Sequence, residues 1–405
     1  MKLTPEEVLE YVREEDVKFI RLAFCDVFGR QRNIAVMANE LQRAFDVGIA
    51  FDASAIDGFG GEVRSDLFLH PDASTLTQLP WRPQHGGVAH MFCDITHPDG
   101  TPFRGDTRQV LRRAVQAAED AGYAFRIGSE IEFYLFKLDE DGNPSKVPYD
   151  NAGYMDIAPA DKGENVRREI CLTLERMGIY PEASHHESGP GQNEIDFRHA
   201  DPLTAADHAI IFKAVVRTIA AQYGLWADFS PRPIPDCDGS GMHINVSATG
   251  AGKPDAMPQL IAGLLEHIRD MTLFMNPVSN SYERLGRDKA PRFLTWSPEN
   301  RSQLIRIPAA EGEYRRLELR SPDPSANPYL AFALVVHAGL DGLARGLTPP
   351  APTNVNILAA SDTRLRGIEQ LPRTLGAAVS AAAGSEFIRQ HIPEPILAAY
   401  RARQT

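Results

Sequence analysis

Five short segments of this chain alternate apolar and polar residues, and their polar positions are occupied mainly by Glu, His and Arg. The segments cover residues 125–136, 194–198, 242–247, 304–307 and 316–320. Because successive side chains of a strand point to opposite faces of a sheet, each segment predicts a strand with one apolar face. An antiparallel strand with one face in water gives the same alternation by default, so no single segment is decisive. The five together, with few lysines, predict a sheet with one charged face.

This charged face has the chemistry of a metal and phosphate site. The alternation places Glu130, Glu132, Glu194, His243 and Glu318 on it. Carboxylate oxygens are the ligands that Mg²⁺ and Mn²⁺ prefer, and Mn²⁺ also accepts an imidazole. Arginine, which shares the face, binds phosphate and carboxylate groups through its planar guanidinium. Phosphoryl transfer onto a carboxylate requires both kinds of side chain, so the face predicts that chemistry.

The sequence contains no P-loop motif, no kinase glycine loop and no G-x-G-x-x-G, so a glycine motif cannot identify a nucleotide site. Two other glycine segments remain. DGSGMH at 238–243 is a common kind of turn into a strand. HHESGPGQNE at 185–194 places two histidines and two glutamates around Gly-Pro-Gly, which predicts a connection that carries ligands.

The length of 405 residues indicates at least two domains. The Pro- and Gly-rich segment 97–106 predicts a boundary between a small mixed domain, residues 1–103, and a larger one, residues 104–405. The first domain is expected to contain strands at 17–24 and 88–95, and a Gly- and Asp-rich loop at 51–66. Apolar spacing and end signals predict helices at about 4–13, 107–121, 164–177, 204–223, 258–274 and 328–345, with more helix after a loop at 346–360. The fold class expected is α+β.

Composition excludes several classes of partner. The formal net charge of −12 disfavours nucleic acid and anionic membranes. No segment approaches the ~20 apolar residues of a membrane helix, and the N-terminus lacks the apolar region of a signal peptide. The four cysteines form no CxxC motif, which indicates reduced thiols. A cytoplasmic protein is therefore expected.

Taken in order, the segments resemble type I glutamine synthetase. The motifs are GSEIEF, SHHESGPGQNEIDF, GSGMH, NSYERL, NRSQLIRIP and RRLELRSPDPSANPYL, and the resemblance runs from residue 17 to residue 334. It implies a small N-terminal β-grasp domain and a larger catalytic domain whose antiparallel sheet is flanked by helices. It also implies stacked rings, as in a dodecamer, with active sites between subunits of one homo-oligomer. The substrates implied are ATP, glutamate and ammonia, with two or more Mg²⁺ or Mn²⁺ ions at each site.

The same motifs imply roles for individual residues. One metal would be held by Glu132, Glu187 and Glu194, and a second by Glu130, His243 and Glu318. Glutamate would be bound by Arg284, Arg320 and Gly239. The ATP phosphates and the transferring group would be stabilised by Arg301, Arg306 and Arg316, and the nucleotide contacted by Glu182 and Ser247. Asp52 would reach the neighbouring subunit's site and help to deprotonate ammonium. The resulting ammonia would then displace phosphate from γ-glutamyl phosphate.

The ammonium side departs from the family pattern. Lys289 stands where the family usually has a flap glutamate before Ala-Pro, and Ala55 replaces a serine that often helps to bind ammonium. A cation should repel ammonium there, unless Lys289 turns to solvent and Asp288 substitutes. Asp238 and Asn245 are further differences. A γ-glutamyl ligase for an organic amine, either a monoamine or a polyamine, is therefore the alternative to glutamine synthesis.

Two other functions are less consistent with the sequence. A non-catalytic nitrogen sensor would not need six retained metal ligands, and a guanidino kinase would not share the N-terminal motifs. No tyrosine lies between Tyr329 and Tyr400, which predicts no control by adenylylation. The sequence given ends at Thr405, whereas many relatives continue into a tail that ties the rings together, so a looser dodecamer or a smaller assembly is expected.

Overall fold

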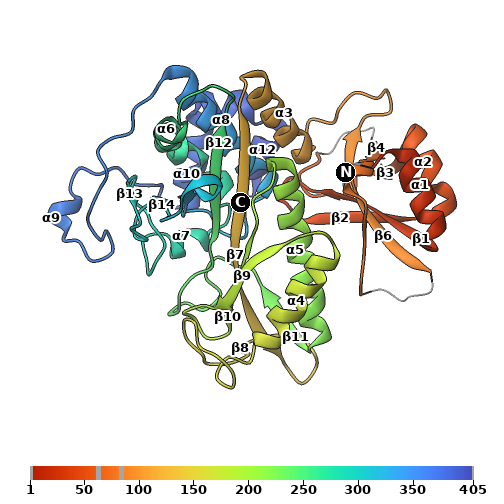
Figure 1. Cartoon of the computed structure of the whole chain (residues 1–405), viewed down its shortest axis with the longest axis horizontal. Coiled ribbons are helices and arrows are strands. Elements are labelled where there is room, and N and C mark those ends of the chain that lie inside the picture. Colours follow the sequence, from red (N-terminus) through yellow and green to blue (C-terminus); the bar gives the residue numbers. More distant parts are fainter. Residues whose placement is uncertain (1–2, 61–64, 82–85, 404–405) are drawn as a thin grey trace.

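The structure is a computed structural model that describes residues 3–60, 65–81 and 86–403. The N-terminal part lies to one side of a larger body (Figure 1). Its sheet has the order β2–β1–β6–β4–β3, with β5 paired to β6, and β1 and β6 are parallel neighbours. The strands are β1 (Val17–Cys25), β2 (Gln31–Met37), β3 (Ile49–Asp52), β4 (Asp66–Pro71), β5 (Thr77–Gln78) and β6 (Gly87–Thr96). Helices α1 (Pro5–Glu14) and α2 (Leu41–Val47) accompany them, which gives the expected β-grasp arrangement.

Among the described residues, the larger sheet has nine strands in the order β13–β14–β15–β12–β7–β10–β9, with β8 and β11 also paired to β7. All pairs are antiparallel except β13 with β14, which is parallel. The strands are β7 (Ala124–Leu138), β8 (Pro144–Pro148), β9 (Pro181–His186), β10 (Gln192–Phe197), β11 (Leu225–Asp228), β12 (Met242–Thr249), β13 (Trp296–Pro298), β14 (Ile305–Ile307) and β15 (Leu317–Leu319). The long strand β7 thus links the segments that the alternation singled out.

The larger body also contains helices. They are α3 (Thr107–Asp120), α4 (Glu164–Arg176), α5 (Pro202–Gln222), α6 (Met257–Met275), α7 (Ser281–Arg284), α8 (Pro328–Arg345), α9 (Asp362–Leu365), α10 (Leu375–Gly384), α11 (Glu386–His391) and α12 (Glu394–Ala402). Helix α5 packs on β7 through Phe212 and Phe133, whose ring centroids are 6.0 Å apart. Helices α6 and α8 approach closely at Gly263 and Gly342, where an added Cβ would lie 2.0–2.1 Å from a backbone oxygen of the other helix. None of the described helices is long and apolar enough to cross a bilayer.

The helices begin and end near the predicted positions because their end signals are local. Asp106 accepts hydrogen bonds from the backbone nitrogens of Arg108 and Gln109 at the start of α3. Gly346 adopts a left-handed conformation after α8, with φ of 60°. The α+β class is confirmed. Strands β2–β5, β8, β9, β11 and β13 were not predicted, and part of the expected 51–66 loop is β3 and β4, while residues 61–64 lie outside the described residues.

One buried arginine joins the two parts of the molecule. Arg108 on α3 is 4 % exposed, and its guanidinium lies 2.9 Å from Asp72, 3.1 Å from Asp94 and 2.9 Å from Asp207. Asp72 and Asp94 belong to the N-terminal part, and Asp207 lies on α5. Burial would raise the pKa of Asp72, but Arg108 and Ser74 lower it to about 2.

Candidate active site

The strand register collects the charged residues on one face of the larger sheet. Glu132 of β7 is paired with Glu194 of β10, and Glu130 with His243 of β12. Glu318 of β15 is paired with Arg306 of β14 on one side and with Asn245 on the other. Cross-strand partners point to the same face, so like charges that are opposite each other destabilise the sheet unless a cation lies between them. The predicted charged face is therefore present.

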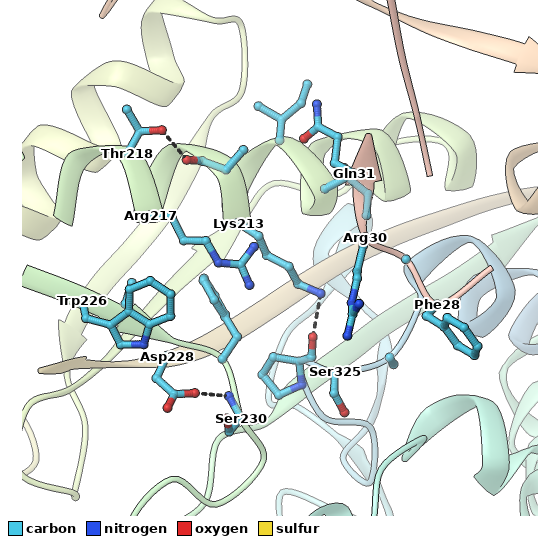
Figure 2. A pocket seen from close by; sticks show the side chains of 18 of the residues that line it. Phe28, Arg30, Gln31, Lys213, Arg217, Thr218, Trp226, Asp228, Ser230 and Ser325 are labelled. Carbon is cyan, nitrogen blue, oxygen red and sulfur yellow. Dashed lines mark hydrogen bonds between the residues drawn. The ribbon is translucent and has the colours of Figure 1, made fainter. Parts of the chain in front are cut away.

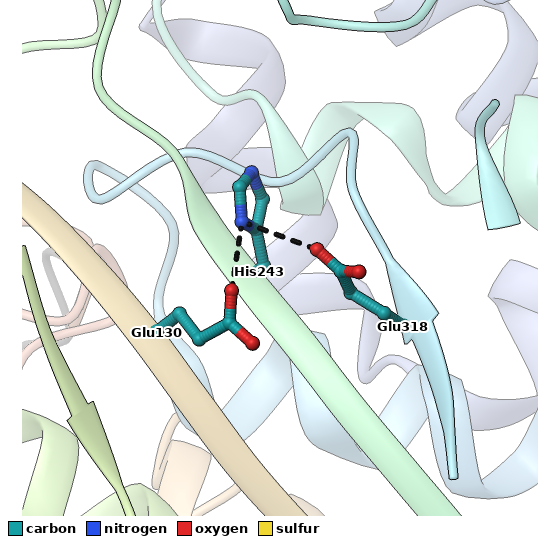
Figure 3. Close-up of side chains that lie close together, drawn as sticks. All are labelled: Glu130, His243 and Glu318. Atoms are coloured by element: carbon teal, nitrogen blue, oxygen red, sulfur yellow. Dashed lines mark hydrogen bonds and ion pairs between the residues drawn. The ribbon is translucent and has the colours of Figure 1, made fainter. Parts of the chain in front are cut away.

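Glu130, His243 and Glu318 form the first cluster (Figure 3). Nδ1 of His243 lies 3.3 Å from Glu130 Oε2 and 3.4 Å from Glu318 Oε1, and three potential ligand atoms lie within 4.8 Å of one another. Glu318 is fully buried, and Nε of Arg320 donates to its Oε1 at 3.0 Å. Two carboxylates and one imidazole at this spacing fit a divalent cation such as Mn²⁺ or Mg²⁺.

A second cluster lies beside it. Ligand atoms of His185, Glu187 and Glu194 lie within 4.8 Å of one another. Glu132 lies close enough for its charge to raise the pKa of Glu194, but its Oε2 accepts hydrogen bonds from Gln192 Nε2 at 3.0 Å and from the nitrogen of Gly241 at 2.9 Å. His185 thus joins two of the three residues expected for one metal. The sequence indicated this histidine only as part of a ligand-bearing connection.

The electrostatics of the clusters also fit a cation. Burial, followed by Glu132 and Asp196, raises the pKa of Glu194 well above its usual range. Burial and the Glu130 carboxylate raise the pKa of Asp196 to about 7. Oδ1 of Asp196 is buried and has no hydrogen-bond partner among the described residues, although Glu130, Glu194 and Asp196 form a further group within 4.8 Å. Divalent cations would relieve this repulsion, so the donor set fits the metal that the sequence predicted.

Several predicted substrate residues surround the clusters. Arg320 donates to the backbone carbonyls of Lys289, at 3.2 Å, and of Arg301. Nε of Arg316 donates to Asn245 Oδ1 at 2.9 Å, and Asn245 Nδ2 donates to Glu130 at 2.8 Å. Asn245 therefore links an arginine to the first cluster.

Arg284 is 2 % exposed and donates to the backbone carbonyls of Ser321, at 2.8 Å, and Arg320, at 3.4 Å. A Cβ added at Gly239 would lie 2.5 Å from the Pro231 oxygen and 2.8 Å from Cγ of Arg284. Only glycine therefore fits against this arginine at the edge of the site.

Three predicted residues are not members of the clusters, although the charge of Glu182 helps to raise the pKa of Asp196. Asp52 lies at the end of β3, where its exposed carboxylate accepts a hydrogen bond from the nitrogen of Ser54 at 2.9 Å. Glu182 is exposed on β9, and Ser247 is paired with Arg126 near the end of β12. A role for Asp52 requires a neighbouring subunit, as the resemblance implied.

Two family models match the chain, the glutamine synthetase β-grasp domain over residues 16–98 and the glutamine synthetase catalytic domain over residues 104–405. The chain belongs to the glutamine synthetase family. Among its relatives, glutamine synthetase of Methanosarcina mazei is 47% identical over 412 residues, covering 98% of this chain and 92% of the relative. That of Clostridium saccharobutylicum is 45% identical over 416 residues, covering 99% and 94%.

Solved structures agree with this family. A complex of GmaS with ADP superimposes with a TM-score of 0.88 at 28% identity, covering 100% of this chain and 95% of the other. Plasmodium falciparum glutamine synthetase, at 22% identity, shares the fold with a TM-score of 0.85 over 99% of this chain and 96% of the other. Membership makes this chain a carbon–nitrogen ligase.

Lys289 lies on the predicted acceptor side of the site and contacts the segment that carries Glu187. Nζ of Lys289 lies 3.3 Å from Glu187 Oε2, 2.7 Å from Ser188 Oγ and 4.5 Å from the centre of the Tyr154 ring. Asp288 does not take the place of the missing glutamate, since its carboxylate pairs with Arg232 at 2.8 Å. Burial would raise the pKa of Glu187, but Lys289 holds it below its usual value. A cation of the chain itself thus contacts a predicted metal ligand.

A buried pair supports the Glu187 segment from behind. Nδ1 of His186 donates to the Glu187 carbonyl at 2.6 Å, and Nε2 lies 2.9 Å from Asp150 Oδ1. Asp150 also accepts hydrogen bonds from the backbone nitrogens of Gly191, at 3.0 Å, and Lys162, at 2.9 Å. No local pattern in the sequence indicates Asp150, because its partners come from other segments of the chain.

Proposed function

We propose that this ligase joins ammonia to the γ-carboxylate of glutamate, using ATP and passing through γ-glutamyl phosphate. The observation that carries the proposal is the strand register that brings Glu130, His243 and Glu318 together beside Glu187 and Glu194. The names of relatives at 44–47% identity support glutamine as the product.

In this proposal the chain's residues bind and orient two anionic substrates. Divalent ions held by Glu132, Glu187 and Glu194 and by Glu130, His243 and Glu318 would neutralise the charge of the nucleotide phosphates. Arg301, Arg306 and Arg316 stabilise the transferring phosphoryl group, while Glu182 and Ser247 contact the nucleotide. Arg284, Arg320 and Gly239 hold glutamate with its γ-carboxylate towards ATP. The ADP complex of GmaS supports a nucleotide in this fold.

The second step needs a neutral amine, because an ammonium ion has no lone pair to attack the acyl phosphate. We assign the proton acceptor to Asp52 of a neighbouring subunit, which requires a homo-oligomer. A cytoplasmic dodecamer built from domains 1–103 and 104–405 is the assembly we propose, and the family matches at 16–98 and 104–405 support this division.

The test is phosphate release by the purified protein with ATP, Mg²⁺ and glutamate. Ammonium is compared with a panel of monoamines and polyamines at one pH and ionic strength. Ammonium as the best acceptor, with glutamine identified by mass spectrometry, is the expected result. Absence of phosphate release with every acceptor would refute a ligase of this kind.

A second acceptor class is favoured by one observation. Lys289 places a positive charge against Glu187, and Ala55 removes a hydroxyl that the family uses for ammonium. Both changes weaken binding of a small cation and leave the metal clusters intact. An organic amine as the preferred acceptor, with ammonium near background, would establish a γ-glutamyl-amine ligase instead.

A further inference from the structure

A large cavity lies away from the metal clusters, between the N-terminal part and helix α5 (Figure 2). Its volume is about 1740 Å³. The walls come from the turn between β1 and β2, from α5, and from β11 with the loop that follows it. None of the six predicted metal ligands lines it. The proposed reaction gives this cavity no role.

The lining of the cavity is strongly basic. Eight lysine and arginine residues line it, against two acidic residues, Asp228 and Glu283. The whole chain, in contrast, has a net charge of −12. A cavity with one sign of charge concentrates ions of the opposite sign. Arg30, Arg32, Lys146 and Arg232 have carboxylate partners, so the positive charge left for an anionic occupant includes above all that of Lys213 and Arg217.

Two of these cations lie on one face of α5. Lys213 and Arg217 are four residues apart, a spacing at which like charges destabilise a helix. Neither has a carboxylate within 4.0 Å among residues 3–60, 65–81 and 86–403. The nearby Asp228 is instead paired with Lys146 at 3.1 Å. This arrangement costs free energy that a bound anion would offset.

The ammonium group of Lys213 also has few hydrogen-bond partners within the protein. It is 8 % exposed, yet its ammonium group makes a single hydrogen bond among the described residues, to the Pro324 carbonyl at 2.6 Å. An ammonium has three N–H donors, so two remain for a ligand. Burial and Arg217 lower the pKa of Lys213 to about 8, so it is still mostly protonated at neutral pH.

Arg30 approaches the same space from the opposite wall. Figure 2 shows Lys213, Arg217 and Arg30 directed into the space between α5 and the β1–β2 turn. The only ion pair of Arg30 among the described residues is a long contact with Asp57, at 3.5 Å, and both side chains are more than half exposed. Such an exposed pair contributes little and is easily exchanged for a ligand.

We propose that this cavity binds a small polyanion with at least two carboxylate or phosphate groups, held by Lys213 and Arg217 on one side and Arg30 on the other. Two anionic groups are required because the cations come from two separate walls. The ligand joins the N-terminal part to α5 and goes beyond the proposed function, since it is neither substrate nor product.

The test measures binding of pyrophosphate and of tricarballylate to the full-length protein in metal-free buffer by calorimetry. Arg217→Gln and the double variant with Arg30→Gln remove cavity charges on exposed side chains. The matched control is Arg269→Gln on α6, exposed and outside the cavity. We expect saturable binding of one or both probes, weakened about tenfold by Arg217→Gln and about a hundredfold by the double variant, and unchanged in the control.

Each binding result either supports an anion in this cavity or contradicts it. Pyrophosphate binding alone identifies a phosphate-bearing ligand, and tricarballylate binding alone a polycarboxylate. Affinity that is equal in the double variant and in Arg269→Gln would place the probe in the active site and overturn the proposal. No saturable binding, with an oligomer that dissociates when Arg30 and Arg217 are replaced, would instead assign the cavity to a second copy of the chain. Phosphate release with glutamate and an amine is measured in parallel and tests the proposed function separately.

Discussion

Among single residues, Lys289 has the contacts that bear most directly on the proposed acceptor site. Lys289 contacts Glu187 and Ser188, and its charge lies over the ring of Tyr154. Its side chain is 49% exposed, so water screens part of its effect. A modest but measurable influence on the binding of a cationic acceptor follows from this position.

Replacing Lys289 with Ala or Glu should lower the KM for ammonium by about five- to tenfold, because a repelling charge is removed. Arg287→Gln, in the same segment, serves as the control and should behave like the native protein. The KM is taken from initial rates of phosphate release over a range of ammonium concentrations. An unchanged KM in both Lys289 variants would show that this lysine does not control the acceptor.

The first cluster allows a separate test of metal binding. His243→Asn keeps the pairs of Glu318 with Arg306 and Arg320, so the protein should remain folded. We expect Mn²⁺ binding, followed by electron paramagnetic resonance, to weaken by at least ~10-fold, since even outer partners of a metal contribute that much. His267→Asn, which alters a histidine paired with Asp341, is the control. Equal Mn²⁺ affinity in the two variants would remove His243 from the metal site.

At the scale of elements, β7 and its neighbours hold carboxylates whose repulsion is a cost to the metal-free protein. Asp196 has a pKa of about 7 in the folded chain, above its ordinary value near 3.8. A carboxyl group whose folded pKa is raised destabilises the fold progressively as pH rises towards that folded pKa. The metal-free protein should therefore lose stability between about pH 4 and pH 7 as Asp196 ionises.

Asp196→Asn should therefore raise the melting temperature of the metal-free protein by a few degrees. The gain should be small near pH 4, grow up to about pH 7 and then remain constant. Differential scanning calorimetry of both proteins at several pH values measures it. A gain that does not change with pH would show that Asp196 is not buried among the other carboxylates.

At the scale of the whole molecule, the N-terminal part and the larger body are joined by Arg108. This buried guanidinium forms ion pairs with three carboxylates. Its neighbour Arg112 is 41% exposed and forms ion pairs with two of the same carboxylates. Removing one partner of a buried ion pair leaves unpaired charge, while an exposed pair contributes little.

Arg108→Ala should cost about 3–5 kcal/mol of the free energy of unfolding. Arg112→Ala should cost less than ~1 kcal/mol. Urea unfolding, followed by the fluorescence of the native tryptophans, compares the two. Similar losses for both variants would mean that the junction does not depend on the buried arginine.

Elements whose signals are local could be predicted from the amino-acid sequence. Helix α3 begins at the Asp106 cap and α8 ends at Gly346, and both were predicted to within a residue or two. The alternation in β7, β10, β12 and β15 identified the charged face, because side-chain direction in a strand depends only on position along it. The resemblance to glutamine synthetase, confirmed by the family matches, rests on the same segments.

Which side chains come into contact depends on the folding of the whole chain and could not be predicted from local patterns. Strands β9 and β11 carry no alternation and exist because they pair with β10 and β7. The contact of Lys289 with Glu187 joins residues that are 102 positions apart in the sequence. The basic cavity likewise unites Arg30 with Lys213 and Arg217, 183 and 187 positions away. Strand register and helix packing set these distances, and both depend on the whole chain folding together rather than on any local pattern.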